Sequence, residues 1–431
     1  MNRKSAFFYG WYLVAICVIS MILIYGIRHS FAVFFSSILE EFSWSRGDTA
    51  MMMSLNILTY GLMAPIAGTM ADRWRARVLL PVGVILLGIA TAGCAFATRL
   101  WHFYFLFGFL MSIGSAFSGW PLFGPALMNW FVRKRGLVLG LGQMGGGLSF
   151  VYSIFVEFSI RSWGWRYTFL VLSFVLMGIL LPLLFCFFFY RPDEKNMFAY
   201  GTQEADFPAP RAQSRVGEKT ENTLLSLGEG LKDVFKARQL WFLIASYALY
   251  WGIAAYMVIA HQVRFLQDEG LSSSFSASIY ALLGVMIVLG NCSGFLSDWL
   301  GREKCHSFAT CLSIIGLGAL IGVNDASRGW LVFAFAVLFG YGTGMVSPVT
   351  FAASADIFDG RHFGTVAGLV LGGMGVGSVL GPWLGGYLYD AFGTYRVTFV
   401  LCMISIVFSN IFLWVAAPRN FQMGMGQTLD T

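Results

Sequence analysis

The chain alternates between long apolar segments and short polar ones. A helix that crosses the hydrocarbon core of a membrane needs about 20 apolar residues, and the pattern predicts twelve such helices. The predicted spans are residues 8–36, 48–71, 78–98, 101–129, 136–160, 166–190, 240–266, 275–297, 305–323, 329–355, 363–389 and 395–417. We therefore expect an all-α membrane protein embedded in a lipid bilayer.

The longest polar stretch lies between the sixth and seventh spans, at residues 191–238. Its first part is rich in Pro, Gln, Glu and Arg, which is typical of a flexible linker. Near its end, apolar residues recur at helical spacing and predict a short amphipathic helix on the membrane surface. They are Leu224, Leu227, Leu231, Val234 and Phe235. The chain thus divides into a six-helix bundle (1–190), a cytoplasmic linker (191–238), and a second six-helix bundle with a short tail (239–431).

Composition excludes several classes of protein. Hydrophobic residues make up 57% of the chain and charged residues only 12%, against about 25% in an ordinary soluble domain. The seven cysteines form no CxxC pair, so we expect neither a metal site nor a disulfide framework. No HExxH or GxSxG site is placed for catalysis, and no P-loop is present. We expect no enzyme activity, no cofactor and no nucleotide-driven step.

The net charge of +6 indicates orientation rather than a nucleic-acid partner. Most Lys and Arg residues lie in alternate polar segments, namely the N-terminus, 73–77, 133–135 and 191–238. Such segments remain in the cytoplasm. We therefore expect both termini to be cytoplasmic. We also expect the protein to be a monomer in the cell membrane.

The two predicted bundles share sequence motifs. GTMADR from Gly68 recurs as GFLSDW from Gly294, RGLVLG from Arg135 as FGTVAG from Phe363, and GWRYTF from Gly164 as GTYRVTF from Gly393. The three offsets lie between 226 and 229 residues, so two related bundles are expected, with a site between them near the midplane. A glycine-rich stretch from Gly368 to Gly386 is interpreted as a close helix contact.

Residues at these repeats match the loop signature G-x-x-x-D-[RK]-x-G-[RK]. The second copy carries Gly294, Asp298, Gly301 and Arg302, and the first retains Gly68, Asp72, Arg73 and Arg77. Through this signature the whole chain resembles the major facilitator superfamily. The resemblance implies a fold of two pseudo-symmetric six-helix bundles and a gating role for both motifs. Physically, each Asp ends a helix where it can meet the positive N-terminal end of a neighbouring helix.

Further segments resemble the monocarboxylate porter branch, including its oxalate/formate-exchanger-like relatives. They are YGW from Tyr9, YGIRHSFAVFF from Tyr25, EFSWSR from Glu41, the segment from Pro121 to Gly136, and HQVRFLQDEG from His261. Some cations implied by this resemblance are absent: the helix 8 arginine falls on Gly290, the helix 1 lysine aligns with His29, and helix 11 has no lysine. The resemblance implies transport of small organic anions and leaves the substrate open.

Arg28 lies well inside the first predicted span. An arginine there costs about 2.5–3.5 kcal/mol to insert, so it usually faces a cavity or a partner. We expect it to clamp a carboxylate. The alternative is an arginine that reaches the interface or pairs with an acid such as Glu157. The adjacent His29 is expected to bind substrate as well, and to gain a proton when an anion binds, which would couple the two; otherwise it is a packing histidine.

The remaining candidates are polar groups within other spans. His261 and Arg264 share a face of the seventh span, where they are expected to bind or gate an anion, or else to lie at the interface. Glu157 is a candidate proton carrier or a salt-bridge partner. Tyr60, Gln143 and Tyr341 are expected to hydrogen-bond substrate.

The expected function is secondary active transport of small organic anions by alternating access, with proton-coupled monocarboxylate symport as the leading hypothesis. One alternative is carboxylate exchange of the oxalate–formate type. Another is efflux of a hydrophobic or aromatic compound, which would not require Arg28.

Overall fold

The structure, a computed structural model, describes residues 8–73, 76–131, 135–201, 235–325, 328–358 and 363–418. These residues are almost entirely helical and contain no β-strand, apart from an isolated bridge between Phe131 and Tyr200. The amphipathic helix expected around residues 224–235 lies almost wholly outside the described residues. So do the side chains of Asp72 and Arg73.

The N-terminal half runs from α1 to α9. Its helices are α1 (Gly10–His29), α2 (Phe31–Phe42), α3 (Arg46–Arg73), α4 (Ala76–Cys94), α5 (Leu100–Phe103), η1 (Tyr104–Leu110), α6 (Met111–Ser118), α7 (Trp120–Trp130), α8 (Arg135–Leu148), η2 (Ser149–Val151) and α9 (Tyr152–Phe187). A short helical turn, η3 (Pro192–Lys195), follows.

The C-terminal half runs from α11 to α18. Its helices are α11 (Arg238–Tyr247), η5 (Ala248–Ala255), α12 (Tyr256–Asp268), α13 (Ser273–Cys292), η6 (Ser293–Phe295), α14 (Leu296–Leu300), α15 (Arg302–Ile321), α16 (Gly329–Ile357), α17 (Phe363–Phe392) and α18 (Arg396–Ala416).

The described residues contain eleven helical segments long and apolar enough to cross a membrane. One of them, Leu137–Phe187, has 51 residues and would be about 75 Å long if straight, far more than a bilayer core of about 30 Å. Gly164 interrupts it with φ +80°, in the left-handed region that glycine tolerates, so the segment divides into two spans. The prediction of twelve spans is therefore confirmed.

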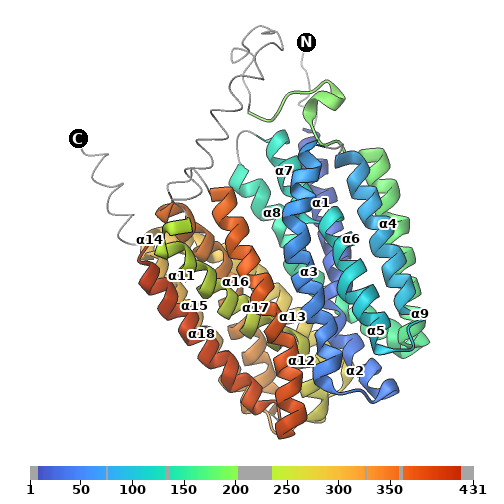
Figure 1. The fold of residues 1–431 in the computed structure, drawn as a ribbon, viewed down its shortest axis with the longest axis vertical. Coiled ribbons are helices and arrows are strands. Elements are labelled where there is room, and N and C mark those ends of the chain that lie inside the picture. Colours follow the sequence, from blue (N-terminus) through green and yellow to red (C-terminus); the bar gives the residue numbers. More distant parts are fainter. Residues whose placement is uncertain are drawn as a thin grey trace.

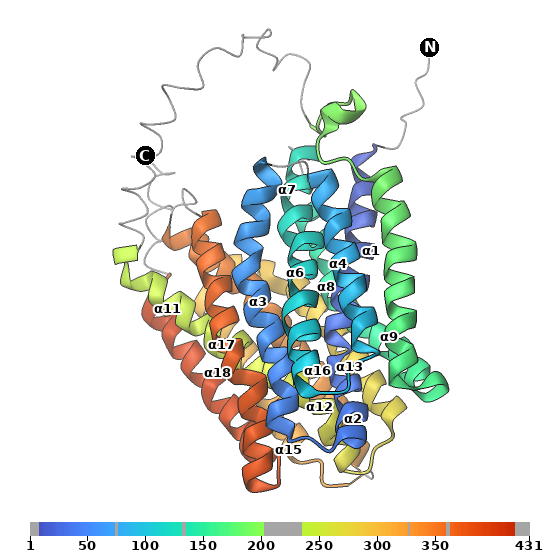
Figure 2. The same ribbon diagram turned by 45° about the vertical axis from the view of Figure 1, so that its right-hand side comes forward.

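The two halves stand side by side, with α3 and α17 in contact at their boundary (Figure 1). Gly10, which begins α1, and Ala416, which ends α18, lie on the same side of the molecule, here called the termini face (Figure 2). The turns after α2, α12 and α17 lie on the opposite side, the far face.

Described contacts between the halves run from the middle of the molecule to the far face. A Cβ at Gly386 would touch Arg46, and one at Gly61 would lie 3.3 Å from Gly375. At a second contact between the halves, between α9 and α13, Ser153 Oγ donates to Ala277 O at 3.2 Å.

Towards the termini face the packing loosens. A Cβ at Gly68, Gly140, Gly368 or Gly372 would meet no atom within 4 Å. The halves therefore close on the far face and separate towards the termini face.

The first span is interrupted near its middle. Val33 N donates to Ser30 O instead of to His29 O, because the helix tightens for one turn at Ser30. The freed carbonyl of His29 accepts a hydrogen bond of 2.7 Å from Tyr280 Oη of the other half. Arg28 and His29 thus lie where the first span touches the C-terminal half.

Candidate functional site

Arg28 lies in the last turn of α1, buried between aromatic rings. The residue is 4% exposed. Its Cζ lies 4.3 Å from the centre of the Tyr60 ring and 5.3 Å from that of Tyr25. The two tyrosine hydroxyls bond each other at 2.8 Å, which fixes both rings beneath the guanidinium. The ring faces stabilise the cation without neutralising it.

The Arg28 guanidinium keeps two donors unpaired. Nε and Nη2 are buried, and no hydrogen-bond acceptor among the described residues reaches them. These two groups form one edge of the planar guanidinium, the edge that binds a carboxylate through two parallel hydrogen bonds. The alternative pairing with Glu157 does not occur among the described residues, because Glu157 Oε2 accepts from Ser274 and Oε1 has no partner there.

The His29 side chain contacts two residues of its own half, Ser149 and Phe150. Its Nδ1 lies 2.7 Å from Ser149 Oγ, and its ring stacks on Phe150 at 4.1 Å. Since the Ser149 hydroxyl donates its hydrogen to Gly146 O, it accepts from His29 Nδ1–H. This assigns the neutral tautomer in which Nε2 carries the lone pair that can take up a proton.

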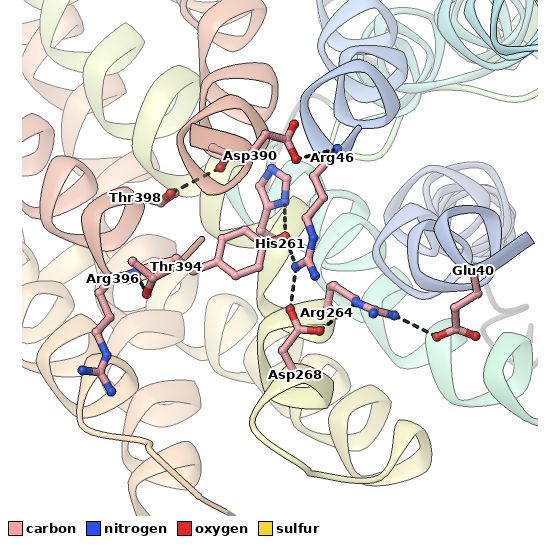
Figure 3. A network of polar contacts seen from close by, with 11 residues as sticks. Glu40, Arg46, His261, Arg264, Asp268, Asp390, Thr394, Arg396 and Thr398 are labelled. Atoms are coloured by element: carbon pink, nitrogen blue, oxygen red, sulfur yellow. Dashed lines mark hydrogen bonds and ion pairs between the residues drawn. The ribbon is translucent and has the colours of Figure 1, made fainter. Parts of the chain in front are cut away.

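Five charged residues form a second group, the far-face cluster: Glu40, Arg46, Arg264, Asp268 and Asp390 (Figure 3). Glu40 and Arg46 come from the N-terminal half and the other three from the C-terminal half. Arg46 bonds Asp268 at 2.5 Å, and Arg264 bonds Glu40 at 2.8 Å and Asp268 at 3.0 Å. The Arg46–Asp268 and Arg264–Glu40 pairs join the two halves, and the Arg264–Asp268 pair within α12 links them to each other.

Asp390 joins the halves in a different way. Its carboxylate accepts from the backbone N–H groups of Arg46 (3.0 Å) and Gly47 (2.8 Å), at the start of α3. An acid from α17 therefore satisfies the free donors at the N-terminus of a helix in the other half.

His261 lies behind this cluster. Its Nε2–H donates to Pro382 O at 2.7 Å, and Nδ1 accepts from Tyr395 Oη at 3.2 Å. The Tyr395 hydroxyl also accepts from Arg46 Nη1 at 3.0 Å. His261 thus ties helices of the C-terminal half together, and the structure brings neither it nor Arg264 to Arg28.

The other predicted site residues are spread over the boundary of the halves. Glu157 and Arg161 of α9 both bond Ser274 of α13 near the far face. Gln143 is exposed on α8, one turn before the contact of Gly147 with Val288. Tyr341 is half-buried on α16.

The loop signature of the C-terminal half is assembled at the termini face. Gly301 has φ +92°, and Arg302 pairs with Asp298 at 2.5 Å and with Asp356 of α16 at 2.8 Å. In the first copy, Gly68 is half-buried and Arg77 is exposed, donating to Phe185 O at 3.3 Å. Within the described residues, no group of three or more His, Cys, Asp or Glu side chains could hold a metal ion.

Several residues of the Arg28 site and of the far-face cluster were not predicted from the sequence. Tyr25 precedes Arg28 by one helical turn, so helical spacing alone could have found it. Arg46, Asp268 and Asp390 carry no such signal, because their partners are more than 200 residues away in the chain.

Comparisons with solved structures agree with this architecture. A D-xylose–proton symporter superposes with a TM-score of 0.72 at 13% identity, covering 94% of this chain and 97% of that one. A bacterial homologue of the human lysosomal transporter Spinster gives 0.68 at 18% identity, covering 98% and 97%. These likenesses concern the fold.

Sequence comparison identifies the family. The Major Facilitator Superfamily profile matches residues 14–335 and 293–422. Curated relatives include monocarboxylate transporter 11 of Mus musculus (28% identity, 95% of this chain and 88% of the relative), monocarboxylate transporter 12 of Homo sapiens (23%, 95% and 80%) and monocarboxylate transporter 3 of Rattus norvegicus (27%, 94% and 79%). The predicted fold and superfamily are confirmed: this chain is a membrane transporter of the Major Facilitator Superfamily, and its curated relatives are monocarboxylate transporters.

Proposed function

We propose that this protein is a secondary transporter that moves monocarboxylates together with protons by alternating access. The observation that carries the proposal is the buried, unpaired Nε–Nη2 edge of Arg28. A buried donor without an acceptor costs about 1–3 kcal/mol, and more when it is charged. A bound carboxylate removes that cost and neutralises the guanidinium, and the names of the curated relatives agree with such a substrate.

Proton coupling is assigned to His29. Its Nε2 lone pair is the free acceptor, and the neighbouring Arg28 charge opposes protonation while the site is empty. A bound carboxylate removes this repulsion, so the anion and the proton enter together. Glu157, whose Oε1 has no partner among the described residues, is the second candidate carrier.

Gating is assigned to groups on both faces. The far-face cluster, with Arg264 and with His261 behind it, holds the halves together in the present state and must open for the opposite one. Asp298 and Arg302, with Asp72, Arg73 and Arg77 of the first copy, are proposed to act at the termini face, which the Lys and Arg distribution assigns to the cytoplasm. Tyr60 supports Arg28, while Gln143 and Tyr341 are proposed to contact substrate when the halves close.

Uptake into proteoliposomes tests the proposal. The purified monomeric transporter is reconstituted, and labelled pyruvate is offered with an imposed proton gradient or with unlabelled pyruvate inside. We expect gradient-driven accumulation that a protonophore abolishes. Uptake only against a loaded interior would instead support carboxylate exchange. Absence of uptake in both formats, for pyruvate, lactate, formate and oxalate alike, would contradict carboxylate transport.

A further inference from the structure

Among the described residues, buried N–H donors without acceptors occur in both halves, and two of them stand on or beside helices that contact α17. One is the Nε–Nη2 edge of Arg28, and the other is the indole Nε1–H of Trp251 on η5. Folded proteins seldom leave a buried N–H unpaired, because the group has lost its water and gained nothing in return. Because these two donors belong to different halves, the pair points to a ligand with two acceptors.

Both donors lie at about the same depth in the molecule. Tyr60, which supports Arg28, is followed by Gly61, whose Cβ position lies 3.3 Å from Gly375 of α17. Trp251 is followed by Gly252, whose Cβ position lies 2.7 Å from Met374 O and 2.9 Å from Gly377 Cα. A single turn of α17 thus touches the segment that carries each group.

Aromatic rings lie beside each of these donors. Tyr25 and Tyr60 meet edge-to-face beside the Arg28 guanidinium, and their hydroxyls bond each other. On the other half, Tyr256 packs against Trp251 with ring centres 6.0 Å apart. It also lies near enough to the Arg28 guanidinium for the two groups to interact electrostatically. Rings from both halves therefore offer π faces, which favour an aromatic guest.

We propose that the preferred substrate is an aromatic monocarboxylate with an oxygen acceptor on its ring. The carboxylate binds Arg28, the ring lies among Tyr25, Tyr60, Tyr256 and Trp251, and the ring oxygen accepts from Trp251 Nε1–H. A two- or three-carbon acid satisfies only the arginine and leaves the indole unpaired. This inference rests on the proposed carboxylate transport and narrows its substrate class.

Competition in proteoliposomes separates the contributions. Uptake of labelled 4-hydroxyphenylacetate is inhibited with unlabelled acetate, phenylacetate, 4-hydroxyphenylacetate and the uncharged 4-hydroxyphenylacetamide. We expect phenylacetate to compete at a concentration at least about tenfold lower than acetate, the hydroxylated acid to compete better still, and the amide not to compete.

Trp251→Phe tests the indole donor, since it keeps a ring and removes the N–H. We expect it to abolish the advantage of 4-hydroxyphenylacetate over phenylacetate. Trp330→Phe, at a tryptophan 69% exposed on α16, is the matched control and should preserve that advantage. Thermal unfolding of both variants checks that each remains folded.

The outcomes separate the two proposals. Transport of pyruvate or lactate without any preference for aromatic acids would overturn the substrate class and leave carboxylate transport standing. Retention of the hydroxyl advantage in Trp251→Phe would overturn the indole contact. Transport of no carboxylate, short or aromatic, would overturn both the substrate class and the proposed function.

Discussion

Among the described residues, Arg28 is stabilised by aromatic rings and pairs with no acid. A cation over an aromatic face gains about 0.5–2 kcal/mol and keeps its full charge, whereas a carboxylate partner would neutralise it and occupy its donors. The Tyr25–Tyr60 hydroxyl contact holds the rings in place, so the guanidinium edge is oriented before any ligand arrives. Such preorganisation reduces the entropy lost on binding.

Replacing Arg28 by lysine separates charge from shape. Arg28→Lys keeps a cation but not the planar pair of donors, so we expect the half-saturating carboxylate concentration to rise about tenfold or more. Arg28→Gln should abolish uptake while the protein still elutes as a single folded species at the wild-type volume. Arg99→Gln, in an exposed turn, is the control. Wild-type uptake kinetics in Arg28→Gln would refute the clamp.

His29 should separate coupling from binding. We expect His29→Asn to retain exchange of external for internal carboxylate and to lose accumulation driven by a proton gradient, because asparagine cannot carry a proton. Ser149→Ala, which removes only the acceptor for Nδ1–H, should weaken accumulation less severely. Undiminished accumulation in His29→Asn would exclude this histidine and direct attention to Glu157.

At the scale of whole helices, the N-terminus of α3 depends on a carboxylate from α17. Asp390 supplies acceptors to two backbone donors of α3, and Arg46 in the same turn stacks on Tyr389 at 3.5 Å. A helix N-terminus together with an acid gains about 0.3–1 kcal/mol near the surface. If the halves rock as proposed, the interaction is weak enough to break in each cycle and is made only while the far face is closed.

Asp390→Asn should therefore shift the conformational equilibrium. Loss of about 1 kcal/mol in the closed far face corresponds to roughly a fivefold change in populations. Spin labels replacing the exposed Trp101 and Trp330, one in each half, would report a larger share of long distances. Asp193→Asn, exposed beyond α9, should leave the distance distribution unchanged. An unaltered distribution in Asp390→Asn would remove Asp390 from the gate.

Helix packing also explains an absent cation. Gly290 of α13 occupies the position where the family arginine is expected, and a Cβ there would collide with Tyr341 O and lie 3.0 Å from Gly344 Cα. This side of α13 packs on α16. It therefore has no room for a side chain of any charge.

Gly290→Ala should be destabilising by about 1–3 kcal/mol, since backbone atoms of α16 must move. Gly178→Ala, at a glycine on α9 with no atom within 4 Å of its Cβ position, is the matched control and should be tolerated. Thermal unfolding in detergent measures both. Equal midpoints would show that α13 and α16 can separate without cost.

The whole molecule closes on one face and separates on the other. Because the described contacts between the halves extend from the midplane to the far face, Arg28 and His29 lie at the inner limit of the closed region. In the proposed mechanism, a substrate bound there would sit where rocking of the halves changes access from one face to the other.

Orientation is a prediction at this scale. We expect a fluorescent protein fused after Thr431 to be fluorescent and alkaline phosphatase fused at the same point to be inactive, since both termini are assigned to the cytoplasm. The opposite pattern would reverse the sides assigned to the two gates.

The amino-acid sequence by itself predicted the twelve spans, the repeated halves and the place of Arg28 inside the first span, and its loop motifs indicated the superfamily. Each of these follows from hydropathy, motif spacing or the cost of a charge in lipid, which are properties of a residue and its near neighbours. Only the tertiary structure decided that no described acid pairs with Arg28, that Tyr25 and Tyr60 lie against its guanidinium, and that His261 and Arg264 belong to a separate far-face group. Gly290 likewise required the fold for its explanation. These relations depend on which helix faces pack together across two halves more than 200 residues apart in sequence. The local sequence pattern does not specify which faces these are.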